Sequence, residues 1–287
     1  MQERAGGAIG RAAAIAGEAD TSMDREADDE QFLRDAAAFA GTLADAARPI
    51  ARRYFRGKLT VIDKADASPV TIADREIEHS LRALIRARFP DHGIYGEEEG
   101  GVALDADRLW VVDPIDGTKS FISGMPLFGT LVAWLEAQRP RLGIIDMPVL
   151  DERWIGMAGR PTLRNGEPCR TRAGTRLAEA VIYATSPDGF DAADWARFEA
   201  VSRRARMRRF GGDCYAYALL ASGCIDVVME AGLKPYDYLP LVPVIEGAGG
   251  VITGWRGETL GMGSDGRVLA TASRDLHQDI LAVLAAR

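Results

Sequence analysis

Apolar residues recur at helical spacing near the start of the chain and predict two helices. The segment Asp29–Arg56 repeats them every three or four positions, at Phe32, Ala36, Phe39, Leu43 and Ala47. A second helix is predicted to start at Ser68-Pro-Val-Thr71 and to end at Phe89-Pro90, because proline ends a helix. Lys58–Lys64, between the two helices, is predicted to be a short strand or a loop.

The next part of the chain is predicted to form an antiparallel sheet. Gly93–Gly101 has the composition of a loop, and Arg108–Val112 is an apolar strand. Three further apolar runs are joined by short turns, which is typical of an antiparallel meander. These runs are Leu127–Glu136, Arg141–Pro148 and Glu152–Met157. Asn165-Gly166 then predicts a tight turn.

Beyond residue 175 the pattern changes to strands alternating with helices. The predicted strands are Val181–Thr185, Ile225–Met229, Gly250–Thr253 and Val268–Thr271. The predicted helices are Asp191–Arg204, Cys214–Ser222, Asp237–Gly247 and Leu276–Ala286. We therefore expect an α+β half over 31–175, an α/β half over 176–287, and a disordered extension over 1–30.

Composition and charge limit the kinds of molecule and compartment that we expect for this protein. The chain has 287 residues and a formal net charge of −7, so general nucleic-acid binding is not expected. No apolar run has the length of a membrane span. The three cysteines, Cys169, Cys214 and Cys224, form no CxxC pair, which excludes a disulfide framework and favours a reducing cytoplasm.

Two carboxylates follow the strand Arg108–Val112 and indicate phosphate chemistry. Asp113 and Asp116 stand in the run Asp-Pro-Ile-Asp-Gly-Thr, where a helix start is predicted at Gly117 and Thr118. Close carboxylates repel each other unless a cation lies between them, and Mg²⁺ prefers oxygen ligands. Pro114 donates no hydrogen bond, so the Ile115 carbonyl is a candidate third ligand. The alternative is that Asp116 only caps the helix.

Other acids have both a structural and a functional interpretation. Glu97 and Glu98 form either a solvated patch or oxygen ligands that complete the aspartate site. Asp74 forms a capping box with Thr71, or it orients an attacking water together with the Thr118 hydroxyl. Asp237 is either a helix cap or a metal ligand from the second half, and Glu230 is a strand-end acid that could be solvated.

Taken together, the motifs resemble the inositol monophosphatase family over residues 31–287. The matching runs are Ser68-Pro-Val-Thr-x-x-Asp74, Gly96-Glu-Glu98, Asp113-Pro-Ile-Asp-Gly-Thr118 and Glu230…Tyr-Asp237…Gly247-Ala-Gly-Gly250. The resemblance implies a layered αβαβα sandwich, a homodimer and an enzyme that uses two or three Mg²⁺ ions per active site. Tyr236 departs from the pattern, since the family usually has Trp there.

The resemblance also assigns roles residue by residue. The metal ligands it implies are Glu97, Asp113, the Ile115 carbonyl, Asp116 and Asp237. Asp74 and Thr118 would orient the nucleophilic water, and Glu98 would be a third catalytic residue. Backbone N–H groups at Gly117 and Thr118 would bind a phosphate oxygen.

One branch of the family is most similar, the histidinol-phosphate phosphatases. The similarity lies in Asp116–Thr130, Gly143–Pro148, Glu152–Trp154 and Gly212–Tyr217. In this interpretation Asp213 and Glu230, with Asp237 beside them, bind a substrate that carries a cationic amine. Asp213 could instead be an N-cap of the helix that follows it. The arginine-rich stretch Arg203–Arg209 is predicted to be a solvated helix end, although Arg209 could help to receive an anionic substrate.

The sequence therefore predicts a Mg²⁺-dependent phosphomonoesterase of histidine biosynthesis. We expect metal-activated water to convert L-histidinol phosphate to L-histidinol and phosphate. Alternative substrates are inositol-1-phosphate, fructose-1,6-bisphosphate and 3′-phosphoadenosine nucleotides. A different class of function, a non-catalytic relative that binds metal or a partner protein, is disfavoured because the acid set is complete.

Overall fold

The computed structural model describes residues 7–57, 61–63 and 69–286, with side chains from Glu30 onward apart from residues 58–70. The helices are α1 (Gly7–Tyr54), α2 (Ile72–Arg88), α3 (Thr118–Ser123), α4 (Ala192–Ser202), α5 (Cys214–Ala221), α6 (Pro235–Tyr238), α7 (Leu241–Gly247) and α8 (Arg274–Ala285). Among the described residues, no helix combines the length and the apolar character needed to cross a membrane.

The first large sheet has eight strands in the order β10-β9-β8-β7-β6-β5-β3-β4. They are β3 (Gly93–Gly96), β4 (Gly100–Val102), β5 (Arg108–Asp116), β6 (Gly129–Glu136), β7 (Arg139–Met147), β8 (Glu152–Met157), β9 (Leu163–Arg164) and β10 (Glu167–Pro168). The predicted meander is confirmed, because β6, β7 and β8 pair antiparallel in sequence order. Strand β3 is parallel to β5.

The second large sheet has five strands in the order β12-β11-β13-β15-β14. They are β11 (Val181–Ala184), β12 (Met207–Phe210), β13 (Val227–Glu230), β14 (Val251–Thr253) and β15 (Val268–Thr271). Strands β12, β11 and β13 are parallel, whereas β15 runs antiparallel to both of its neighbours. A separate pair is formed by β1 (Val61–Asp63) and β2 (Pro69–Thr71).

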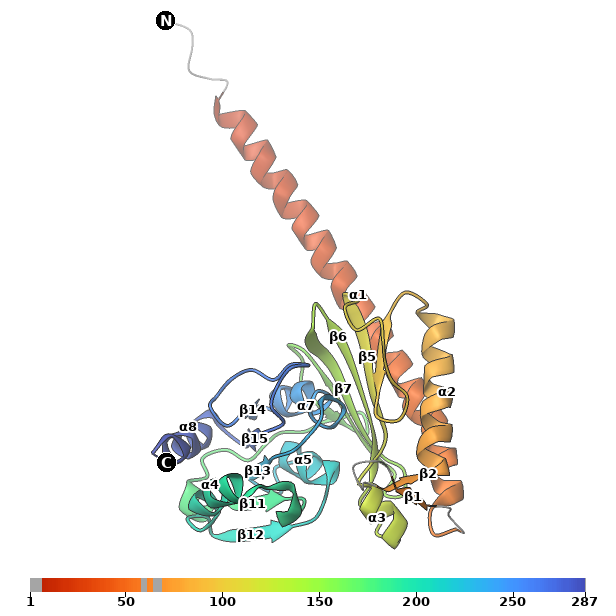
Figure 1. Ribbon diagram of the computed structural model, residues 1–287. Coiled ribbons are helices and arrows are strands. Elements are labelled where there is room, and N and C mark those ends of the chain that lie inside the picture. The colour runs from red at the N-terminus through yellow and green to blue at the C-terminus, as the bar shows by residue number, and fades with distance from the viewer. Residues whose placement is uncertain (1–6, 58–60, 64–68, 287) are drawn as a thin grey trace, which may run out of the picture.

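Alternation of side chains along the strands produces the layers. On β5, Trp110 and Val112 pack with α1 and α2 on one face of the first sheet, while Leu109 and Val111 point to the opposite face. That opposite face shares a core with α5, α7 and the second sheet. The outer face of the second sheet packs against α4 and α8. The result is the predicted five-layered αβαβα sandwich, with α5 and α7 between the two sheets (Figure 1).

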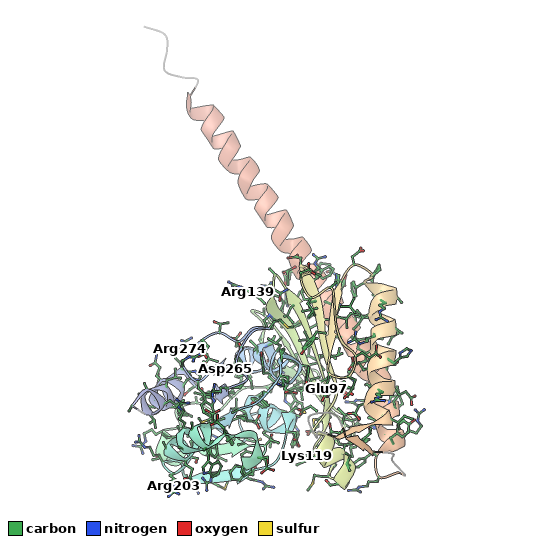
Figure 2. All side chains as sticks on the ribbon, in the orientation of Figure 1. Glu97, Lys119, Arg139, Arg203, Asp265 and Arg274 are labelled. Carbon is green, nitrogen blue, oxygen red and sulfur yellow. The ribbon has the colours of Figure 1, made fainter. Side chains whose placement is uncertain are left out.

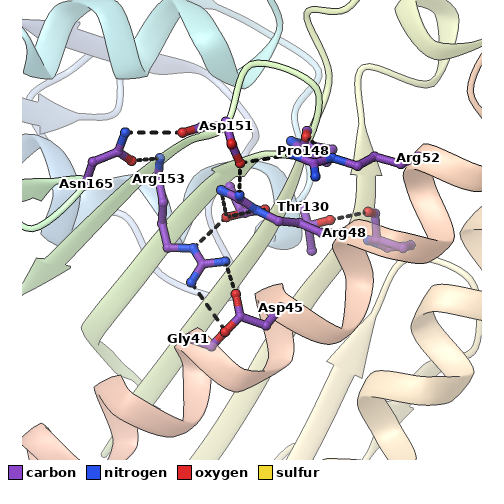
Figure 3. A network of polar contacts seen from close by, with 11 residues as sticks. Gly41, Asp45, Arg48, Arg52, Thr130, Pro148, Asp151, Arg153 and Asn165 are labelled. Carbon is purple, nitrogen blue, oxygen red and sulfur yellow. Dashed lines mark hydrogen bonds and ion pairs between the residues drawn. The ribbon is translucent and has the colours of Figure 1, made fainter.

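Helix α1 is held on the first sheet by a buried ion network (Figure 3). Asp146 on β7 is fully buried and accepts hydrogen bonds from Arg48 of α1 at 2.8 Å and 2.9 Å. Arg153 of β8 donates to the same carboxylate at 2.5 Å and to Asp45 of α1 at 2.7 Å. The carboxylate is therefore satisfied by two guanidinium groups, as a buried charge requires.

Several predicted boundaries need correction near the start of the chain. Helix α1 begins at Gly7, so residues 7–30 are helical in the structure where a disordered extension was predicted. The N-terminal part of α1 projects away from the sheets (Figure 1). Helix α2 begins at Ile72, after strand β2, because Thr71 is the N-cap. Ser68 and Lys64 lie outside the described residues.

Three other predictions were wrong in a way that affects the site. Gly93–Gly101 is a β-hairpin of β3 and β4 with a turn at 97–99, not a loop. The predicted helix Asp237–Gly247 is interrupted at Pro240, which divides it into α6 and α7. The stretch Arg203–Arg209 is not a helix end throughout, because Met207–Phe210 forms the edge strand β12.

Candidate active site

The two carboxylates of the Asp-Pro-Ile-Asp run lie at the end of β5, where that strand contains a bulge. Asp113 pairs with Leu131 and Asp116 with Gly129, so β5 has one more residue than β6 across this interval. The Pro114 carbonyl accepts a hydrogen bond from Thr130 Oγ1 at 2.8 Å, which fixes the bulge. Strand β5 thus continues through the motif, beyond the predicted end at Val112.

The bulge brings three carboxylates together. One carboxylate oxygen from each of Asp113, Asp116 and Asp237 lies within 4.8 Å of the other two. Asp237 comes from α6, where its Oδ2 accepts the Lys234 backbone N–H at 2.6 Å. Asp116 Oδ2 accepts the Cys214 backbone N–H at 2.6 Å, at the start of α5. The cluster is therefore assembled from β5 and from two helices of the second half of the chain.

Burial and repulsion dominate the electrostatics of the cluster. Burial, followed by the negative charges of Glu97 and Asp116, raises the pKa of Asp113 well above its usual range. Burial also raises the pKa of Asp237 to about 7, with the Glu97 charge adding to the shift. The neighbouring charges that shift the pKa of Asp113 are all negative. Such a cluster is stabilised by a cation.

Asp74 forms the capping box that was one of its two alternative roles. Its Oδ2 accepts the Thr71 backbone N–H at 2.8 Å and the Thr71 hydroxyl, which completes a capping box at the start of α2. Its Oδ1 is buried and has no hydrogen-bond partner among the described residues. Burial raises the pKa of Asp74 to about 6, and the Glu97 charge also raises it. The capped helix thus holds one free oxygen at the site.

The residues fit a hard divalent cation. Asp113 Oδ1, like Asp74 Oδ1, is buried without a hydrogen-bond partner in the described part of the chain. Buried polar atoms are normally satisfied, so such oxygens need an explanation. The available donors are carboxylate and carbonyl oxygens, which suit Mg²⁺ better than thiol-preferring metals. Asp113, Asp116 and Asp237 could hold the ion directly, with Glu97 beside them.

A cavity of about 350 Å³ opens beside the acid cluster. Its lining includes Glu97, Gly117, Thr118, Asp213, Glu230 and Asp237. All six of these residues were predicted as site residues, and they border one space. Lys119 also lines it, although it was not predicted as a site residue and lies only within the similar run Asp116–Thr130. Figure 2 labels Glu97 and Lys119 at the boundary between the two halves.

Asp213 is not a side-chain cap of α5. It occupies the N-cap position with φ 47°, an uncommon conformation for a residue other than glycine, and makes no capping hydrogen bond. Its Oδ2 accepts the Ser120 hydroxyl at 2.7 Å. A Cβ at Gly117 would stand 2.9 Å from Asp213 Cγ, so this close approach requires glycine at 117. Strain of this kind is often found at functional sites.

Glu230 is buried at the end of β13 rather than solvated. Its Oε1 accepts the Thr185 backbone N–H at 2.7 Å, and its Oε2 accepts the Tyr217 hydroxyl at 2.8 Å. Burial raises the pKa of Glu230, while these two hydrogen bonds oppose the rise. Tyr217 closes the run Gly212–Tyr217 that carries the family resemblance, but it was given no role in the site.

The remaining predicted residues differ in their contacts and in their distance from the cluster. The Thr118 hydroxyl donates to the Ile115 carbonyl at 3.2 Å, so these two candidates contact each other. Glu98 follows Glu97 in the β3–β4 turn. Arg209 lines a neighbouring cavity, which shares Lys119 with the first one, and its guanidinium lies 5.9 Å from the centre of the Tyr183 ring. Arg203 is on the outer side of the second half, away from Glu97 (Figure 2).

Comparisons with known proteins agree with this architecture. The model of the inositol monophosphatase family matches residues 33–287. The bifunctional phosphatase IMPL2, chloroplastic, of Arabidopsis thaliana is 47% identical over 271 residues, which cover 91% of this chain and 75% of the relative. A histidinol-phosphatase of Chlorobaculum parvum is 34% identical over 244 residues, covering 84% of this chain and 93% of the relative.

A solved structure supports the same conclusion. An inositol monophosphatase from Zymomonas mobilis superposes with a TM-score of 0.81 at 44% identity, and the match covers 88% of this chain and 98% of that one. The family is generally metal-dependent, in keeping with the acid cluster. This chain belongs to the inositol monophosphatase family and is a phosphomonoester hydrolase.

Proposed function

We propose that the protein hydrolyses L-histidinol phosphate to L-histidinol and phosphate in histidine biosynthesis. The observation that carries the proposal is the pair of carboxylates, Asp213 and Glu230, on the wall of the cavity that also contains Asp237. A phosphate group at the metal site would bring an amine on the same small molecule within reach of these acids. A neutral polyol has no need for two buried anions there.

The chain's own residues would bind and orient the reactants. Asp74 Oδ1, held by the capping box, accepts a hydrogen bond from the attacking water and aims it at phosphorus. Thr118 fixes the Ile115 carbonyl in its orientation through the hydrogen bond between them. The water oxygen forms a bond to phosphorus as the bond to the ester oxygen breaks. One proton of the water ends on the leaving oxygen, which gives the alcohol, and the other stays with the inorganic phosphate.

The metal is part of this proposal. Glu97, Asp113, Asp116, Asp237 and the Ile115 carbonyl would hold Mg²⁺ ions, as the oxygen donors and the unpaired Asp113 Oδ1 support. When bound, Mg²⁺ would lower the pKa of a water and neutralise charge on the phosphoryl group. Helix α3 has only six residues, so backbone N–H groups at Gly117 and Thr118 would matter more than its dipole.

Hydrolysis of inositol-1-phosphate is the alternative. It is favoured by the similarity to the Zymomonas mobilis inositol monophosphatase. This alternative keeps the proposed metal chemistry and differs from our proposal only in the alcohol that is released.

The experiment compares the two substrates directly. Phosphate release is measured from L-histidinol phosphate and from inositol-1-phosphate, each with Mg²⁺ and with EDTA. We expect Mg²⁺-dependent turnover with a clear preference for histidinol phosphate, and a larger loss of that preference in Asp213→Asn than in Glu230→Gln, whose oxygens are already hydrogen-bonded. A preference for inositol-1-phosphate would overturn the substrate assignment.

We further propose a homodimer located in the cytoplasm. The reason for the cytoplasm is the set of free cysteines, Cys169, Cys214 and Cys224. The Arabidopsis relative is described as chloroplastic, so fractionation of the source cells is the appropriate test. Sedimentation equilibrium tests the dimer: a mass close to 31.0 kDa would show a monomer.

A further inference from the structure

Helix α2 carries a second carboxylate that the proposed chemistry does not use. Glu78 follows Asp74 by one helical turn on the same face, and its side chain is fully buried. Arg82, a further turn along, is also buried, and its Nε donates to Glu78 Oε1 at 2.8 Å. A buried ion pair of this kind gives little net stability, so its position in the fold needs another explanation.

The oxygens of Glu78 point to the turn that carries Glu97. The backbone N–H of Glu98 donates to Glu78 Oε2 at 2.7 Å, and that of Glu99 donates to Oε1 at 2.9 Å. The Arg82 guanidinium extends the contact, because it donates to the Gly100 carbonyl and lies 3.6 Å from the Glu99 carboxylate. One buried ion pair therefore holds the backbone of the whole β3–β4 turn.

Gly96 shows how close this contact is. A Cβ added at Gly96 would stand 2.2 Å from Glu78 Oε1 and 2.5 Å from its Cδ. No side chain fits between the turn and the carboxylate, which leaves the backbone amides directly against Glu78. Charge-assisted hydrogen bonds to backbone N–H groups are stronger and more directional than neutral ones.

The held turn places Glu97 where it is opposed by other negative charges. Glu97 lines the cavity with Asp237, and its charge acts on Asp74, Asp113 and Asp237. Without a cation, this repulsion favours movement of Glu97 out of the site. A hairpin turn held only by the hydrogen bonds between its own short strands would move more easily than a turn that is also hydrogen-bonded to a helix.

We infer that Glu78 is a positioning residue, which holds the Glu97–Glu99 turn against α2 so that Glu97 is in place before a metal ion binds. The inference rests on the proposed metal site. Glu78 itself contacts neither metal nor substrate in this arrangement, and it acts through the backbone of Glu98 and Glu99. Residues that orient metal ligands typically change metal affinity roughly tenfold to hundredfold when they are removed.

The test measures metal binding without substrate, using Mn²⁺ as the probe. The free Mn²⁺ signal in electron paramagnetic resonance gives the affinity of the wild type, Glu78→Gln and the matched control Glu76→Gln. Glu76 lies on the same helix but is partly exposed and bonded to Arg53 and Tyr54. We expect Glu78→Gln to bind Mn²⁺ roughly tenfold or more weakly and Glu76→Gln to bind it like the wild type.

A second readout separates positioning from a general loss of structure. At saturating Mg²⁺, Glu78→Gln should regain most of the wild-type kcat, because excess metal restores the turn. In a Glu97→Gln background, Glu78→Gln should cause no further loss of Mn²⁺ affinity, since it acts through Glu97. If Glu78→Gln does not fold, Glu78→Asp keeps the charge that pairs with Arg82 and is measured in its place.

The outcomes distinguish this inference from the proposed function. A folded Glu78→Gln, or Glu78→Asp if that is the variant measured, with unchanged Mn²⁺ affinity would overturn the positioning role and leave the metal site intact. Failure of the wild type to bind Mn²⁺ would overturn both. Normal Mn²⁺ binding without turnover of histidinol phosphate would overturn only the substrate assignment.

Discussion

Two fully buried aspartates on one sheet have opposite surroundings. Asp146 on β7 faces α1, and its carboxylate accepts hydrogen bonds from Arg48 and Arg153. Asp113 on β5 faces the second half, where it has one oxygen without a partner and negative neighbours. Two arginines neutralise Asp146. Among the described residues, no arginine or lysine does the same for Asp113. The difference supports the proposal that Asp113 binds a cation from solution.

The largest expected effect is on turnover when Asp113 is neutralised. Asp113→Asn removes a proposed metal ligand, and the lost charge stabilisation of several kcal/mol corresponds to a roughly 10³-fold lower kcat/KM. In EDTA the same variant should unfold at a higher temperature than the wild type, because one of several repelling carboxylates is gone. Steady-state kinetics and thermal unfolding measure the two effects. Near-normal turnover would refute the ligand role.

The same chemical change at the other aspartate should have the opposite effect on stability. Asp146→Asn leaves two guanidinium groups at the α1 interface without their shared carboxylate, at a cost of about 3 kcal/mol. Both arginines retain a second acidic partner, Asp151 for Arg48 and Asp45 for Arg153, so the cost falls at the low end for a buried pair. Urea unfolding monitored by circular dichroism gives the value. An unchanged midpoint would show that α1 does not depend on this network.

Added Mg²⁺ should stabilise only the region that lacks cations of its own. At a concentration about 100 times its Kd, a ligand that binds only the folded state adds about 2.7 kcal/mol. We expect Mg²⁺ to raise the melting temperature of the wild type and of Asp146→Asn, but not that of Asp113→Asn. Equal shifts in all three proteins would place the binding elsewhere.

A smaller effect is expected from His277 on α8, which lies outside both acid clusters. Burial lowers the pKa of His277 from 6.5 to about 4, and its ring contacts Thr253 and Thr271. A lowered pKa means that the unfolded chain binds the proton more readily. The contribution of neutral His277 to the free energy of unfolding is therefore fully present above pH 6.5 and is lost as the pH falls toward 4.

Comparison with His277→Gln measures this contribution. Between pH 7 and pH 5 the wild type should lose about 2 kcal/mol more stability than the variant. Chemical unfolding of both proteins at the two pH values gives the difference, and the pH dependence that remains belongs to the acid clusters. Parallel pH profiles of the two proteins would contradict the lowered pKa of His277.

Periodicity predicted the elements whose packing is local. The meander of β6, β7 and β8 and the apolar face of α2 follow from the spacing of their own apolar residues. The break of the predicted helix at Pro240 was visible as a proline but was not used. Strand β12 was missed because an exposed edge strand rich in arginine has no alternating pattern.

The site was predictable as a set of residues but not as a set of contacts. Asp113, Asp116 and Asp237 could be named from short motifs, and the structure brings their oxygens together. The bond from the Cys214 amide to Asp116 joins residues 98 positions apart, a separation that no local pattern encodes. The proposed role of Glu78 likewise depends on hydrogen bonds to the turn at 97–99, in a segment that was predicted to be a loop.

The distribution of the acid cluster along the chain has a consequence during synthesis on the ribosome. Asp113 and Asp116 emerge early, whereas the Cys214 amide that holds Asp116, and Asp237 itself, are added much later. A nascent chain that has only its first half therefore displays an incomplete set of metal-binding acids. We therefore expect hydrolytic capacity to arise only after Asp237 has been added, and fragments released earlier by stalled translation to leave the cell's phosphate esters intact.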